Sequence, residues 1–139
     1  MLMRPHPYLR AYMAGITLPC FLLLFLMLGF TIARYVCDVP VPLERVIVFP
    51  MAVVPNAWGL WNVLFVARRP RRWLSLGAHG AVLPFLLAPT AYTVTRLVGF
   101  EVPEPLARAF PLVFPVVVTA FYLIWKHVVG FLNELLGIG

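Results

Sequence analysis

Two asparagines and two histidines are the residues best able to do chemistry within otherwise apolar sequence. Asn56 and Asn62 lie in one apolar run, His79 lies in the next, and His127 follows a fourth. His79 and His127 are spaced similarly from the turn between their runs, so they would lie level on adjacent helices. Two such imidazoles can ligate a haem. A lone pair of histidines is weak evidence for a metal site, so no cofactor is expected and haem stays an alternative.

Asn62 and His79 flank a basic loop at similar distances. Asn62 lies six residues before Arg68, and His79 lies seven after Arg72, so antiparallel helices would place them at similar depth. They could form a polar site for a headgroup, a quinone ring or a translocated ion. Polar side chains commonly link membrane helices, which favours the interpretation as an inter-helix latch. Asn56, near the middle of its run, also needs a partner because lipid offers none.

The loop itself holds four arginines in five residues: Arg68, Arg69, Arg71 and Arg72. They can mark the cytoplasmic side of a membrane and also contact an anionic lipid such as cardiolipin. No acid–base pair, activated nucleophile, CxxC, HExxH or glycine-rich phosphate loop is found, so we expect neither catalytic residues nor a metal site, and no enzyme.

The elements that must position these residues are four apolar runs. The chain is 63% hydrophobic and 12% charged, with a mean hydropathy of +0.94, which leaves too few polar side chains to cover a soluble domain. Runs of about 18 residues or more can cross a hydrocarbon core of about 30 Å. The sequence therefore predicts an all-α membrane protein with four transmembrane helices, over residues 11–33, 46–67, 74–95 and 109–125.

A repeated phrase indicates that these helices form two tandem hairpins. V-P-x-P-L-x-R begins at Val39 and again at Val102, and G-x-x-L-P begins at Gly15 and at Gly80. Prolines end one helix and permit the next, so each copy predicts a tight turn. The predicted divisions are an N-terminal arm (1–10), hairpin repeat 1 (11–67), a basic loop (68–73), hairpin repeat 2 (74–125) and a C-terminal tail (126–139).

The net charge of +6 gathers on one side of this arrangement. One side holds seven basic residues and one acid: Arg4, Arg10, Arg68, Arg69, Arg71, Arg72, Lys126 and Glu134. The other balances four and four: Arg34, Arg45, Arg96, Arg108, Asp38, Glu44, Glu101 and Glu104. The positive-inside rule then predicts cytoplasmic termini in a multi-pass protein of a bacterial-type inner (plasma) membrane. The charge marks topology, and nucleic acid is not an expected partner.

The tail has the pattern of an amphipathic helix. Its apolar residues recur at three and four: Val128, Phe131, Leu132, Leu135 and Leu136. Its other face carries Gly130, Asn133, Glu134 and Gly137. Such a helix can lie in the cytoplasmic interface or extend the fourth helix against a partner.

The two cysteines cannot pair within the chain. Cys20 and Cys37 lie about 25 Å apart along one predicted helix. We expect Cys20 to be a buried apolar residue, and Cys37 to lie at the external end, free or cross-linked to a partner.

These patterns favour a small accessory or scaffold subunit of a larger membrane protein complex. Its partners would be anionic lipids of the cytoplasmic leaflet and other membrane subunits or further copies of itself. The alternative is a small oligomeric channel or transporter using Asn56, Trp58, Asn62 and His79, although no acid lies within a predicted span. A haem- or quinone-binding membrane subunit is the third interpretation.

Overall fold

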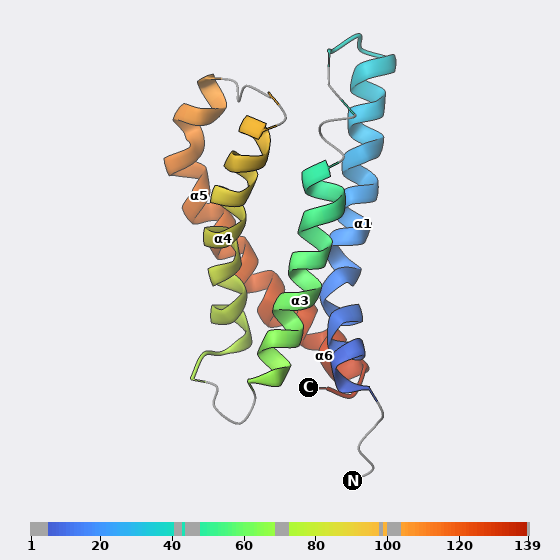
Figure 1. Ribbon diagram of the computed structural model, residues 1–139, viewed down its shortest axis with the longest axis vertical. Coiled ribbons are helices and arrows are strands. Elements are labelled where there is room, and N and C mark those ends of the chain that lie inside the picture. Colours follow the sequence, from blue (N-terminus) through green and yellow to red (C-terminus); the bar gives the residue numbers. More distant parts are fainter. Residues whose placement is uncertain are drawn as a thin grey trace.

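In the part of the chain that the structure describes, four long helices lie roughly along one axis (Figure 1). The computed structural model describes residues 6–40, 43, 48–68, 73–97, 99 and 104–138. Every regular element within these residues is helical, which confirms the all-α part of the predicted fold class. The elements are α1 (Pro7–Tyr35), η1 (Val48–Val53), α3 (Val54–Ala67), α4 (Leu76–Leu97), α5 (Glu104–Ile124), η3 (Trp125–Val129) and α6 (Gly130–Leu135).

The first helix begins inside the predicted N-terminal arm. α1 starts at Pro7, although the arm was expected to reach residue 10. Proline suits the first helical position, because the N–H it lacks would have no partner within the helix there. Pro19 lies within α1 without ending it.

The helices pair as neighbours along the chain. α1 packs against α3, and α4 packs against α5 (Figure 1). The start of α1 and the ends of α3 and α6 lie at one end, which we call the basic end because Arg10 and Arg68 are there (Figure 1). The ends of α1 and α4 lie at the opposite end (Figure 1).

Glycines bring the paired helices into close contact. A Cβ on Gly15 would lie 2.6 Å from the Trp58 carbonyl oxygen and 2.8 Å from Cα of Gly59. In the second pair, a Cβ on Gly80 would lie 2.0 Å from Cγ of Trp125. Small residues allow this approach of backbones and large rings. Gly15 and Gly80 are also the first residues of the two G-x-x-L-P copies.

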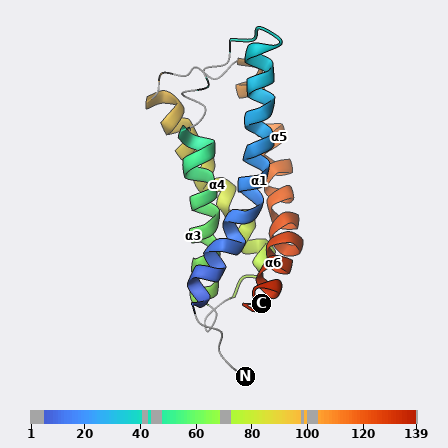
Figure 2. The same ribbon diagram turned by 90° about the vertical axis from the view of Figure 1, so that its right-hand side faces the viewer.

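The fourth helix changes partners along its length. α5 continues through η3, a π-helical segment with a widened turn, into α6. This lower part passes behind α3 in the view of Figure 1 to reach the beginning of α1 (Figures 1 and 2). There Nη1 of Arg10 donates a hydrogen bond to the Leu136 carbonyl, 3.3 Å away. Of the two arrangements considered for the tail, the structure has the one that extends the fourth helix.

The buried side of the tail combines residues from both predicted faces. Asn133 is buried, and Leu132 and Leu136 pack against the cluster at the beginning of α1, whereas Phe131, Glu134 and Leu135 are exposed. The predicted division into an apolar and a polar face was wrong for Asn133, because it has a polar partner inside the protein, which hydrophobic periodicity does not detect.

Two apolar clusters hold the helices together. The first lies at the basic end and comprises Ala11, Ala14, Phe65, Val66 and Ile138. The second joins the two hairpins and comprises Trp58, Leu83, Trp125 and Val129. The buried residues of α1 end at Leu23, so the packed part of the molecule lies toward the basic end.

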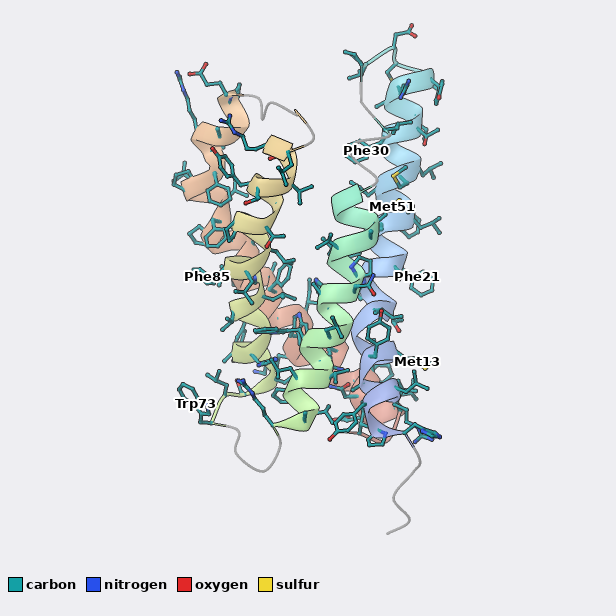
Figure 3. All side chains as sticks on the ribbon, in the orientation of Figure 1. Met13, Phe21, Phe30, Met51, Trp73 and Phe85 are labelled. Atoms are coloured by element: carbon teal, nitrogen blue, oxygen red, sulfur yellow. The ribbon has the colours of Figure 1, made fainter. Side chains whose placement is uncertain are left out.

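Much apolar surface remains uncovered. Phe21 and Phe85 point outward on opposite sides of the molecule (Figure 3). Two helical stretches of 29 residues each, Pro7–Tyr35 and Ala107–Leu135, are long and apolar enough to cross a membrane. Met51–Ala67 is a shorter apolar helix. Cys20 is exposed, contrary to the expectation that it would be buried, because it lies on the α1 face that no other helix covers.

Candidate functional site

His79 and Trp61 join α4 to α3 through two reciprocal hydrogen bonds. The indole Nε1 of Trp61 donates to the His79 carbonyl at 2.8 Å. Nε2 of His79 lies 2.9 Å from the Trp61 carbonyl, and because a carbonyl only accepts, this nitrogen carries the proton. The two rings also stack, with centroids 4.7 Å apart and planes at 19°. The pair is an inter-helix latch in which each side chain grips the other's backbone.

Aromatic rings surround this latch. The His79 ring lies 5.2 Å from that of Phe65 and 6.1 Å from that of Trp125, the latter edge-on. Trp125 in turn contacts Trp58, with centroids 5.4 Å apart. His79 is therefore held by α3, α4 and the fourth helix together, and its imidazole is buried.

A second polar cluster joins α1, α3 and α6. Nδ2 of Asn62 donates to Oδ1 of Asn133 at 2.7 Å, and Nδ2 of Asn133 donates back to Oδ1 of Asn62 at 3.1 Å. Nδ2 of Asn62 also donates to the Ala11 carbonyl at 2.8 Å. Asn62 is 0% exposed, so its whole amide is satisfied within the protein. We call Asn62, Asn133 and the Ala11 carbonyl the amide knot.

The sequence placed Asn62 and His79 at one depth and suggested a direct bond between them. Each has another partner instead: Asn62 bonds to Asn133, and His79 bonds to Trp61. Two separate contacts therefore lie in this part of the protein, one between α3 and α4 and one among α1, α3 and α6.

Asn56 finds its partners at the beginning of α3. Its Nδ2 donates to the Ala52 carbonyl at 2.7 Å, and its Oδ1 accepts from the Tyr12 hydroxyl of α1. Asn56 is an exposed residue of the α1–α3 contact, so it stabilises the first hairpin.

The histidine pair considered for haem has two unlike environments. His79 is buried with Nε2 in a hydrogen bond, and His127 is exposed on η3. Haem ligation through Nε2 of His79 would break the bond to Trp61. The haem hypothesis stays a prediction, and it requires the loss of one of the two hydrogen bonds between His79 and Trp61.

Of the four loop arginines, Arg68 is described and is exposed at the end of α3. Arg69, Arg71 and Arg72 lie outside the described residues. Lipid contact at this cluster stays a prediction.

The sequence indicated Asn56, Asn62 and His79 but not Asn133 or Trp61. The signal available for Asn133 was chemical: it is the third asparagine of an apolar chain, and an amide in such surroundings needs a partner. Trp61 was hidden because an indole within an apolar run also fits ordinary packing.

The chain matches no family model, no curated protein and no solved structure. What can be proposed of its function therefore rests on these residues and their geometry.

Proposed function

We propose that this chain is a multi-pass integral membrane protein and an accessory or scaffold subunit of a larger membrane protein complex. In this proposal all four helices cross a bacterial-type inner membrane, and both termini lie in the cytoplasm with the basic end. The observation that carries the proposal is the bare apolar half of α1.

The membrane placement is supported by which polar groups are paired and which are not. Among the described residues, the indole N–H groups of Trp58 and Trp125 are buried without a hydrogen-bond partner. Moving such a donor out of water costs about 1–3 kcal/mol. Lipid offers no acceptor either, so the same burial costs little when the alternative is a bilayer. These two donors therefore favour a chain that folds in a membrane.

The proposed duplication is supported by the positions that match between the hairpins. Gly15 and Gly80, which align in the sequence, both lie where a helix meets its own hairpin partner. Pro19 and Pro84, the last residues of the same phrase, are both buried. Matching positions with matching roles are typical of a hairpin that was copied and then diverged.

The scaffold role is supported by the distal half of α1, residues 24–35. None of these residues is buried, and its large apolar side chains are exposed around the helix, among them Phe25 at 68% and Leu28 at 57%. Apolar residues all round a helix are typical of a helix surrounded by lipid or by other membrane helices. A helix half with no buried residue offers a surface to another subunit.

The channel or transporter alternative has less support. Asn62, His79 and Trp61 direct their polar atoms at each other or at backbone carbonyls. Trp58 packs its ring against Phe121 and Trp125. Side chains that pair with one another in this way hold helices together rather than line a hydrated path.

The test is native mass spectrometry of the full chain extracted in mild detergent. It compares the wild type with one triple variant and one double variant. Replacing Leu24, Phe25 and Leu28 by alanine should release the chain from its assembly. Replacing Leu112 and Val116, which are equally exposed on α5, is the matched control and should leave the assembly intact. A wild-type chain found only as a monomer with no associated protein would contradict the proposal.

A further inference from the structure

A groove at the basic end combines polar and apolar walls with one charge of each sign. It has a volume of about 420 Å³ and lies between the end of α3, the segment before α4, and the η3–α6 part of the fourth helix. Phe65 and Leu76 form apolar walls, Ser75 and Asn133 add polar groups, and Lys126 and Glu134 supply the charges. In the described part of the chain, neither of these two charged side chains is in an ion pair.

From this groove we infer a binding site for a phospholipid whose headgroup carries a phosphodiester and a primary ammonium, the phosphatidylethanolamine type. The inference rests on the proposed membrane placement and not on the proposed role as a subunit. The two charges of the groove select this headgroup over others.

The two charges have complementary partners on that headgroup. The Lys126 ammonium suits the phosphodiester, since lysine binds phosphate as a point charge. The Glu134 carboxylate suits the primary ammonium, which donates hydrogen bonds to it. An anionic headgroup would meet the Glu134 carboxylate with nothing to pair it. A trimethylammonium headgroup has no N–H to donate.

The spacing leaves room for the headgroup between the two side chains. Lys126 and Glu134 are eight residues apart on one continuous helix, a rise of about 12 Å. Both line the same groove although they start from different turns, and the Lys126 ammonium lies 6.0 Å from the Tyr122 ring. Two extended side chains with a headgroup between them span this distance, whereas the side chains alone form no ion pair among the described residues.

The groove also lies at the depth where a headgroup would be found. Trp73, one of its lining residues, is 88% exposed and points away from the helices at the basic end (Figure 3). Tryptophan is enriched at membrane–water interfaces. Arg68, at the end of α3, is exposed at the same end. The acyl chains of a lipid held here would run along the apolar sides of α4 and α5.

The test measures the melting temperature of the full chain in detergent with added phosphatidylethanolamine, phosphatidylcholine or phosphatidylglycerol of identical acyl chains. The wild type should be stabilised most by phosphatidylethanolamine. The dependence of the melting temperature on lipid concentration gives the affinity for each lipid. Glu134→Gln should lower the ratio of the phosphatidylethanolamine affinity to the phosphatidylcholine affinity by up to about fivefold, the equivalent of one exposed ion pair. Lys126→Gln should weaken binding of all three lipids.

The matched control is Glu104→Gln with Arg108→Gln, an exposed ion pair at the opposite end, which should leave the lipid order unchanged. Equal or stronger stabilisation by phosphatidylcholine or phosphatidylglycerol overturns the inference, as does an unchanged preference in Glu134→Gln. Stabilisation by none of the three lipids also overturns the inference, and it leaves the membrane placement to the cysteine-labelling experiment described in the Discussion.

Discussion

Trp61 and His79 each donate a side-chain hydrogen bond to the other's backbone carbonyl, at 2.8 and 2.9 Å, while their rings stack. Here one residue from each helix supplies a donor, an acceptor and a ring. The contact fixes both the distance between α3 and α4 and their rotation about their own axes.

Removing one donor from this pair should have a measurable and limited cost. Trp61→Phe keeps the ring for stacking and deletes the indole N–H. We expect a loss of about 0.6 kcal/mol in unfolding free energy, and no more than about 1.7 kcal/mol. His79→Ala removes the other donor and the stacked ring, so it should cost more. A double-mutant cycle in detergent, followed by circular dichroism during denaturant unfolding, gives the coupling energy.

The control for this cycle is Trp73→Phe, because Trp73 is 88% exposed. That change should alter stability by less than about 0.5 kcal/mol. Additive effects of the Trp61 and His79 substitutions would contradict the reciprocal arrangement.

The amide knot predicts a specific pattern among single and double variants. Asn62→Leu leaves the buried Asn133 amide without its partner, and Asn133→Leu leaves Asn62 with the Ala11 carbonyl but no partner for its Oδ1 atom. Each single change should destabilise the protein by about 1–3 kcal/mol. The double leucine variant leaves neither amide unpaired, so it should cost less than the two single losses together. Thermal unfolding of the four proteins measures this, and a double variant as unstable as that sum would contradict the pairing.

The close helix contacts predict unequal effects of the same glycine-to-alanine change. Gly80→Ala places a methyl group against the Trp125 ring, and Gly15→Ala places one against the backbone at Trp58. Overpacking of this kind costs about 1–3 kcal/mol. Gly29→Ala is the matched control, since nothing lies within 4 Å of its added Cβ. Melting temperatures should fall for the first two variants only; a similar fall for Gly29→Ala would show that backbone effects dominate.

The native cysteines report the proposed topology. Cys37 follows α1 at the end opposite the basic end, and Cys20 lies within α1. A membrane-impermeant maleimide added to intact cells should label Cys37 and leave Cys20 unmodified, as the single variants Cys20→Ser and Cys37→Ser would show. Ser75→Cys, introduced at the basic end of a cysteine-free chain, should react only after the membrane is opened. Labelling of Ser75→Cys in intact cells would reverse the assigned orientation.

The helices themselves were predictable because their signal is long and one-dimensional. Runs of apolar residues gave the four helices. The predicted proline turns lie mostly outside the described residues, and Pro105 of the second copy lies within α5. The start of α1 was missed by a few residues because Pro7 can begin a helix as well as prevent one.

The partners of the polar residues were not predictable in the same way. The need of Asn62 and His79 for hydrogen bonds follows from their apolar surroundings, and both are bonded. Which residue supplies the bond depends on how the fourth helix passes α3 to reach α1. That part of the helix includes the π-helical turn of η3, and no residue of Trp125–Val129 predicts such a turn from its sequence.

The residues of the amide knot are synthesised at different times. Asn62 is synthesised 71 residues before Asn133. At about 5–20 residues per second, the two amides are made roughly 4–14 s apart. During that interval the Ala11 carbonyl is already present to accept from Asn62. The Oδ1 atom of Asn62 has no donor until Asn133 has been synthesised. The hairpin of α1 and α3 can therefore form early, and it reaches its final stability only when one of the last turns of the chain arrives to complete it.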